Sequence, residues 1–243
     1  MASLIKALAP DPQLPQLFLF PFAGGTANSY RGLANALKSH FSVYAIDPQG
    51  HINRQEPLLD DLETMVEAYL AALLPLIKPD FTLFGHSLGG AVVYRLTQRL
   101  EQLGHAPVTV FISGYHPPHI SDKSTAYLND DQFLEHIEAM GGVPPEIGQD
   151  QSFMRYFLPI FRADFRATET FIHSDRTKIK APVFVLNGDK DDDAIKHMQE
   201  WSYWLNQVRY RIFSGPHMYL SSQPELIATY IIECNQAISI VDE

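Results

Sequence analysis

Features that would direct this chain outside the cell, into a membrane or onto nucleic acid are absent or rare in its sequence. The 243 residues include a single cysteine, Cys234, so the chain forms no internal disulfide, and we expect a cytoplasmic protein with a buried, unreactive thiol. The longest apolar run near the start, residues 17–23, contains Pro21 and is far shorter than a membrane span. The first ten residues are also too weakly apolar for a signal peptide, so no membrane association is expected.

Basic residues are scarce as well. The chain carries 18 Lys and Arg against 28 Asp and Glu, a formal charge of −10, which argues against nucleic acid as a partner and favours solubility. The sequence also contains no internal repeat, low-complexity tract or long linker. Because 46% of the residues are apolar, the chain can bury a sizeable core, and we expect residues 1–243 to form one domain.

Apolar runs and amphipathic segments alternate along the chain. The runs are nearly continuous, which is typical of strands buried on both faces of a parallel sheet. The segments between them have helical spacing, so the order predicts an α/β fold with a doubly wound, mostly parallel sheet and right-handed crossovers. The expected strands are 17–22, 41–47, 81–86, 108–115, 183–189 and 208–214. The expected helices are 29–39, 61–77, 88–103, 194–206 and 224–237.

The chain is organised around Gly85-His86-Ser87-Leu88-Gly89. An apolar strand precedes this stretch and a helical pattern follows at once, which is the setting of the G-x-S-x-G nucleophile elbow. Glycine lacks the Cβ atom that would clash within such a sharp turn. The pattern predicts that Ser87 is a nucleophile at the carboxyl end of a strand, where ligands bind in such sheets. The alternative is a serine in an ordinary glycine-rich turn.

Two backbone N–H groups are expected to stabilise the oxyanion that attack by Ser87 would form. Leu88, directly after the nucleophile and at the start of a helix, supplies the first donor. The glycine-rich turn after the first strand supplies the second, which we assign to Ala23, with Phe22 as the alternative. The same turn could bind a dinucleotide phosphate, but that motif needs G-x-G-x-x-G and only the Gly24-Gly25 pair is present.

A serine nucleophile needs a histidine to take its proton and a carboxylate to hold that histidine. In chains of this fold the order is serine, acid, histidine. The strand that begins at residue 183 ends in an acidic cluster, where the usual Gly-x-x-Asp spacing selects Asp191, with Asp189 and Asp192 as alternatives. His217 follows the next strand and is assigned as the base.

Other members of these groups have competing interpretations. Aspartates are favoured at helix N-termini, so part of the acidic cluster is expected to serve there. His51, in the polar loop after the second strand, could be proposed as a base, but His217 fits the required order better. His86, beside the nucleophile, is expected to pack or orient its neighbours.

These motifs occur together in a known family. The sequence resembles the type II thioesterases, the free-standing editing hydrolases of nonribosomal peptide and polyketide assembly lines, over nearly its whole length. The shared motifs lie at 20–25, 47–54, 85–89, 133–144, 158–164, 188–191 and 215–217. Met140–Pro144 and Arg162–Asp164 are the most specific, because general lipases and peptidases lack them. The chain departs from the family at Pro48–His51, where Pro-Gly-Arg is usual, a difference that bears on acyl preference.

The resemblance implies an α/β-hydrolase with a helical lid insertion that removes acyl groups from the phosphopantetheine arm of acyl or peptidyl carrier proteins. Ser87 would attack the thioester and His217 would activate the water that releases the acid. The substrate itself carries the phosphopantetheine, so no cofactor and no metal are implied. Carrier proteins of a synthase would be the partners, and we expect a monomer, as is usual in the family.

The lid is expected in the long insertion 116–180, with helices near 130–140 and 151–165. Phe153, Phe157, Phe161 and Phe165 recur every fourth residue and would form an apolar underside, which either packs on the sheet or lines the acyl and pantetheine channel.

Charge divides the insertion. Residues 121–150 carry one basic and seven acidic side chains, whereas residues 151–180 carry six basic and three acidic. Carrier proteins are generally acidic, so we hypothesise docking on Arg155, Arg162, Arg166 and Arg176. The alternative for these arginines is a solvated face.

Two other functions stay open. The first is a hydrolase of the same fold that acts on free small-molecule esters or thioesters. The second is a non-catalytic binding protein on a hydrolase fold, which labelling of Ser87 by a fluorophosphonate would exclude.

Overall fold

The computed structural model describes residues 4–121, 124–141 and 151–239, without the side chains of residues 151, 153 and 239. Within these ranges seven strands form one sheet in the order β1-β3-β2-β4-β5-β6-β7. The strands are β1 (Ile5–Ala9), β2 (Gln16–Phe20), β3 (Ser42–Ile46), β4 (Phe81–His86), β5 (Thr109–Ser113), β6 (Val183–Gly188) and β7 (Val208–Phe213).

The predicted mostly parallel sheet is confirmed. Every neighbouring pair is parallel except β1 with β3. All residues of β2, β4, β5 and β6 are buried, as their continuous apolar runs predict. The sequence analysis missed β1, because this short edge strand is only half-buried and its sequence, Ile-Lys-Ala-Leu-Ala, has weak strand character.

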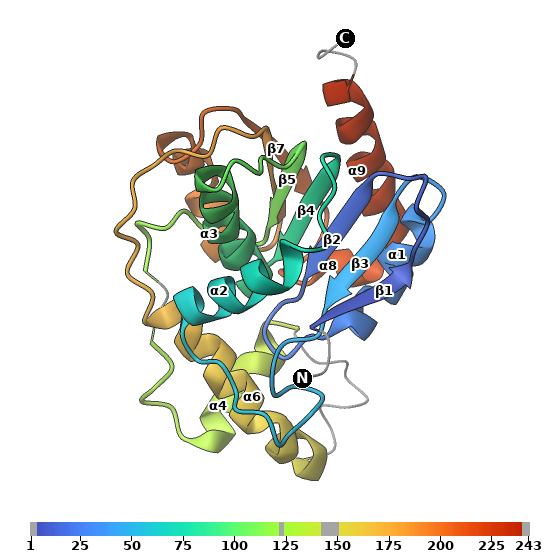
Figure 1. Ribbon diagram of the computed structural model, residues 1–243. Coiled ribbons are helices and arrows are strands. Elements are labelled where there is room, and N and C mark those ends of the chain that lie inside the picture. Colours follow the sequence, from blue (N-terminus) through green and yellow to red (C-terminus); the bar gives the residue numbers. More distant parts are fainter. Residues whose placement is uncertain (1–3, 122–123, 142–150, 240–243) are drawn as a thin grey trace.

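Helices cover both faces of the sheet (Figure 1). The helices α2 (Leu62–Leu73) and α3 (Leu88–Gln102) pack with the 3₁₀ helix η2 (Met198–Tyr203) on one face. The other face is covered by α1 (Arg31–Leu37), α8 (Tyr219–Ser222) and α9 (Pro224–Ser239). Two short elements, η1 (Ala27–Tyr30) and α7 (Asp192–Lys196), follow β2 and β6.

Two helices differ in extent from the sequence prediction. The helix expected over 61–77 ends at Leu73, because Pro75 has no N–H to continue the helical hydrogen bonds, although Leu74 itself keeps helical angles. The helix expected over 194–206 is divided into α7 and the 3₁₀ helix η2. In a 3₁₀ helix residues three apart lie on one side, which lets Met198 and Trp201 both face the core.

Two helices of the insertion lie side by side away from the sheet: α4 (Asp130–Ala139) and α6 (Gln151–Glu169), both in the lower part of Figure 1. They bury a small core of their own, which includes Phe133, Ile137, Met154 and Phe161, with Phe157 and Phe165 packed against it. Three of the four regularly spaced phenylalanines therefore pack within the insertion, and the side chain of Phe153 lies outside the described residues.

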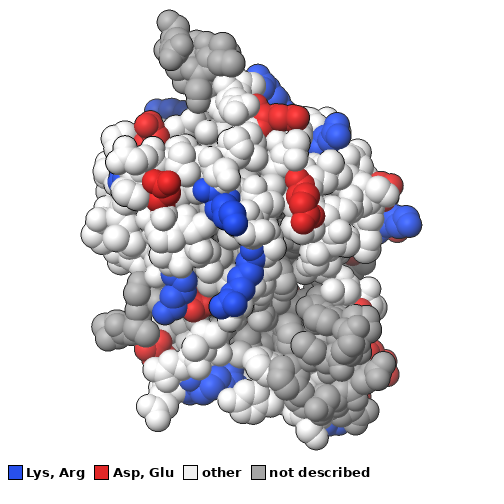
Figure 2. All heavy atoms as spheres, turned by 90° about the vertical axis from the view of Figure 1, so that its right-hand side faces the viewer, with Lys and Arg blue, Asp and Glu red and all other residues white. Residues whose placement is uncertain are grey.

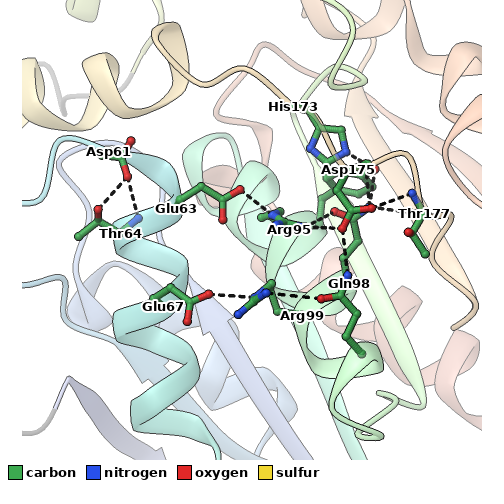
Figure 3. A network of polar contacts seen from close by, with 12 residues as sticks. Asp61, Glu63, Thr64, Glu67, Arg95, Gln98, Arg99, His173, Asp175 and Thr177 are labelled. Carbon is green, nitrogen blue, oxygen red and sulfur yellow. Dashed lines mark hydrogen bonds and ion pairs between the residues drawn. The ribbon is translucent and has the colours of Figure 1, made fainter.

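The segment after α6 is tied to α3 by a polar network (Figure 3). The Arg95 guanidinium lies 2.7 Å from Glu63 of α2 and 2.9 Å from Asp175. Gln98 donates a 2.6 Å hydrogen bond to the carbonyl of Thr177. Although its partial burial acts in the opposite direction, hydrogen bonds from Thr177 and Arg95 hold the pKa of Asp175 at about 2. The return of the insertion to the sheet is therefore anchored on α3, where Glu101 also accepts from the Lys180 and Ala181 N–H groups.

Charged side chains are dispersed over the face that carries β1 and α9. In Figure 2 basic and acidic groups stand singly or in small groups among uncharged residues. The net charge of −10 is therefore not concentrated in one block on this face.

Candidate active site

Ser87 lies in a strained turn between β4 and α3. Its φ of 55° and ψ of −119° make it the one non-glycine residue with positive φ in the described part of the chain, a conformation that costs on the order of 1–3 kcal/mol. Its N–H donates to the Ser113 carbonyl at 2.8 Å. A Cβ at Gly85 would overlap the Gly89 carbonyl, and one at Gly89 would overlap the Phe20 carbonyl. The turn therefore requires both glycines of the G-x-S-x-G pattern.

Asp191 and His217 are brought together by the loops after β6 and β7. Nδ1 of His217 lies 2.7 Å from Oδ2 of Asp191, with 16% and 8% of these side chains exposed. A carboxylate only accepts, so Nδ1 carries a proton and Nε2 of the neutral ring keeps its lone pair. Asp189 instead accepts from the Gly215 N–H at 2.8 Å, and Asp192 is an exposed residue in the first turn of α7.

The ring of His217 lies against the ends of β4 and β5. It lies 5.0 Å from the ring of His86, and a Cβ at Gly114, just after β5, would come within 3.3 Å of it. Among the described residues no hydrogen bond joins the Ser87 hydroxyl to His217. Such bonds are often long without substrate and tighten when it binds. The structure thus pairs His217 with Asp191 and places its ring beside His86, the residue that precedes Ser87.

A hydrogen bond between His86 and Ser113 lies next to this site. Nδ1 of His86 is 2.8 Å from the Ser113 hydroxyl, which is 2.6 Å from the Tyr219 hydroxyl. All three residues are fully buried. Burial, followed by the repulsion that a protonated His217 would exert, lowers the pKa of His86 well below its usual range, so this ring is neutral. Because Ser113 is buried, a substrate carbonyl cannot reach its hydroxyl. Its hydrogen bond instead holds the ring of His86, which lies 5.0 Å from that of His217.

The two backbone N–H groups predicted to form the oxyanion hole are those of Leu88 and Ala23. Leu88 is the first residue of α3, so its N–H has no acceptor within the helix and lies at the positive end of the helix dipole. Ala23 lies in the turn after β2, which is closed by a 2.8 Å hydrogen bond from Gly25 N–H to the Phe22 carbonyl. No acceptor among the described residues takes the Ala23 N–H. The close approach of Gly89 to Pro21 brings the start of α3 against the end of β2.

His51 and Asp164 form a second histidine–aspartate pair, which the sequence analysis did not find. Nε2 of His51 lies 3.2 Å from Oδ1 of Asp164, and the side chains are only 3% and 1% exposed. The contact joins the loop after β3 to α6, and 113 positions separate the two residues. Both residues lie in the shared motifs 47–54 and 158–164, but nothing in the sequence indicated that they contact each other.

The four arginines proposed for carrier docking mostly contact their own chain. Arg155 pairs with Asp131 at 2.7 Å, Arg162 with Asp130 at 2.9 Å, and Arg166 with Asp60 at 3.2 Å. Arg162 also donates to the Leu128 carbonyl and lies over the Phe133 ring. The guanidinium of Arg176 lies 5.9 Å from the centre of the Trp204 ring. Much of the predicted basic surface is therefore offset by neighbouring carboxylates.

The described residues contain neither a metal-binding cluster nor a membrane-spanning helix. No cluster of three or more His, Cys, Asp or Glu side chains is arranged there to hold a metal ion. No helix in the same ranges is long and apolar enough to cross a membrane.

Known proteins with similar sequences or folds include several thioesterases. The thioesterase domain family matches residues 15–233. The thioesterase PikA5 of Streptomyces venezuelae is 31% identical over 90% of this chain and 80% of its own. The linear gramicidin dehydrogenase LgrE of Brevibacillus parabrevis is also 31% identical, over 88% of this chain and 85% of its own. The structure of BorB, a type II thioesterase from the borrelidin biosynthetic cluster, superposes with a TM-score of 0.89 at 27% identity and covers 96% of this chain and 98% of BorB.

The family match spans most of the chain, and the fold agrees with that of the solved relative throughout. The chain therefore belongs to the thioesterase family of α/β-hydrolases and, within it, to the type II thioesterases of nonribosomal peptide and polyketide biosynthesis.

Proposed function

We propose that this thioesterase edits a synthase by hydrolysing acyl groups from the phosphopantetheine arm of its carrier proteins, with Ser87, His217 and Asp191 as the catalytic triad. The observation that carries the proposal is the Asp191–His217 hydrogen bond at 2.7 Å, which occupies Nδ1 of the histidine and leaves Nε2 for proton transfer. Residues 1–243 would act as one domain and a monomer, with residues 116–180 as the lid.

The mechanism follows from the protonation state of His217. Nε2 takes the proton of the Ser87 hydroxyl while the oxygen attacks the thioester carbonyl carbon. The N–H groups of Ala23 and Leu88 stabilise the resulting oxyanion. The carbon–sulfur bond then breaks and the thiol leaves with the proton from Nε2. Water, deprotonated by the same nitrogen, attacks the acyl-serine and releases the acid, which restores Ser87.

The glycine pattern of the turn after β2 argues against a dehydrogenase activity such as the name of LgrE suggests. A nicotinamide-dependent dehydrogenase of this sheet type needs G-x-G-x-x-G after the first parallel strand. The turn after β2 carries only Gly24-Gly25, and its Gly24 N–H is already bonded to Asp164.

The test compares hydrolysis of one acyl group, acetyl, on a carrier protein and on a small pantetheine thioester. We expect much higher kcat/KM on the carrier, and loss of activity in Ser87→Ala by roughly 10⁴-fold or more. Ser113→Ala is the matched control: it removes the buried hydroxyl that contacts His86 and should retain most activity. Equal efficiency on both substrates would favour a hydrolase of free small molecules. A Ser87→Ala variant as active as the parent, with Ser113→Ala inactive, would overturn the triad.

A further inference from the structure

The turn that carries the Ala23 donor is held by hydrogen bonds at several of its other backbone groups. Gly25 N–H bonds the Phe22 carbonyl at 2.8 Å, and Gly24 has a φ of +74°, as the third position of a type II turn requires. The Phe22 carbonyl and the Ala23 N–H belong to one planar peptide unit, so fixing the carbonyl also fixes the direction of the N–H.

Helix α6 of the insertion clamps this turn from outside. Oδ2 of Asp164 accepts the Gly24 N–H at 2.7 Å. One helical turn earlier, the ring of Phe161 lies so close to Gly24 that a Cβ there would overlap it. The two side chains hold the middle of the turn, although 140 positions separate Asp164 from Gly24.

His51 completes the clamp from the loop after β3. Its Nδ1 lies 3.1 Å from the Gly25 carbonyl and its Nε2 lies 3.2 Å from Oδ1 of Asp164. Both partners can only accept, so both ring nitrogens carry protons and the ring is a buried cation paired with a buried anion. Burial lowers the pKa of His51, but the charge and hydrogen bond of Asp164 outweigh it and the pKa is raised overall. Neither nitrogen is free to act as a general base.

We propose that His51 and Asp164 are positioning residues that hold the oxyanion-hole turn, and so make assembly of the oxyanion hole depend on the seating of α6 against the sheet. They touch the Gly24 and Gly25 backbone rather than the substrate, and act through it on the Ala23 N–H. The inference depends on the proposed function, in which Ala23 donates to the oxyanion. It adds that the insertion contributes to the rate of the chemical step as well as covering the site.

The first test is Asp164→Asn, which keeps an acceptor for Gly24 but removes the charge and places an amide against His51. Misplacing one of two oxyanion donors should lower kcat by about 10- to 100-fold with KM changed by less than about threefold, since removing such a donor outright costs 10²–10³. Glu169→Gln is the matched control. Glu169 is the last residue of the same helix, and its carboxylate accepts a 2.6 Å hydrogen bond from the Thr125 hydroxyl rather than from the turn. This variant should lower Tm but leave kcat unchanged.

The second test uses His51→Gln and does not depend on how Asp164→Asn folds. Glutamine still offers an N–H to Asp164 but does not titrate. In the parent the rate of acyl-enzyme formation should fall on the alkaline side of the raised pKa of His51, where the ring loses its charge. Asp164, Arg54 and Tyr69 are the charged or titratable groups that interact with this pair. His51→Gln should lack the alkaline fall.

The outcomes separate this inference from the proposed function. If Ser87→Ala is inactive while Asp164→Asn matches the parent in kcat and His51→Gln keeps the alkaline fall, the positioning role is wrong and the triad stands. If Asp164→Asn and Glu169→Gln lose kcat equally in proportion to Tm, the pair is merely structural. If Ser87→Ala stays active, the proposed function itself fails.

Discussion

Two histidine–aspartate pairs lie at the same end of the sheet and differ in what their histidines can still do. In His217–Asp191 the contact is 2.7 Å, the histidine is 16% exposed, and one ring nitrogen is left without a hydrogen bond among the described residues. In His51–Asp164 the contact is 3.2 Å, the histidine is 3% exposed, and both ring nitrogens are bonded.

The difference shows that the same two residue types serve proton transfer or positioning according to their surroundings. A histidine with one open nitrogen beside water can accept and return a proton near neutral pH. A histidine bonded on both sides in a buried site stays charged and holds its partners in place. Four experiments test this difference. They follow in decreasing order of expected effect.

The largest effect is expected from Asp191→Asn. An amide in place of the carboxylate favours the wrong tautomer of His217, so kcat should fall by about 10⁴-fold, far more than for Asp164→Asn. Steady-state kinetics on an acyl-carrier substrate measure both. Asp192→Asn is the control and should behave like the parent, because Asp192 is exposed at the start of α7. A larger loss in Asp192→Asn than in Asp191→Asn would move the acid to Asp192.

Stability should rank the two pairs in the opposite order. Asp164→Ala leaves the His51 charge buried without a partner and should lower the free energy of unfolding by about 3–5 kcal/mol. Asp191→Ala should cost only about 1 kcal/mol, since His217 can stay neutral and reaches solvent. Urea denaturation of the two variants gives both values. Equal losses would mean that the two sites do not differ in their dependence on burial.

Gly24→Ala should disturb the oxyanion-hole turn directly. Positive φ alone costs an alanine about 1–2 kcal/mol, and here the new methyl group also displaces Phe161. Gly104→Ala is a close control, because Gly104 has a φ of +83° but no atom within 4 Å of the added Cβ. Both variants should lose stability, and Gly24→Ala alone should lose kcat. Unchanged kcat in Gly24→Ala would show that the turn tolerates the shift.

The smallest effects are expected at the surface arginines. Arg155 and Asp131 form an exposed ion pair, so Arg155→Glu should change stability by no more than about 1 kcal/mol. If the carrier docks there, reversing Arg155 and Arg176 together should reduce turnover of carrier-bound acyl groups while sparing small thioesters. An equal loss on the two substrates would remove these arginines from the docking surface.

Much of the fold and part of the site could be predicted from local sequence. The buried strands are continuous apolar runs, and the elbow at Ser87 is set by glycines whose close contacts lie within a few residues. The expected order of serine, aspartate and histidine along the chain selected Asp191 and His217, whose side chains are hydrogen-bonded in the structure. In these cases the interactions that determine the structure join residues close together in the sequence, or recur along one strand or helix.

Only the tertiary structure decided which side chains meet across long separations. It paired Asp191 rather than Asp189 with His217, because Asp189 is taken by the Gly215 N–H. It also turned Asp164 toward Gly24 and His51, which lie 140 and 113 positions away. It neutralised several of the predicted docking arginines with carboxylates of their own chain. A carboxylate in a sequence has no visible partner, and folding alone brings the opposite charge or the free N–H within hydrogen-bonding distance.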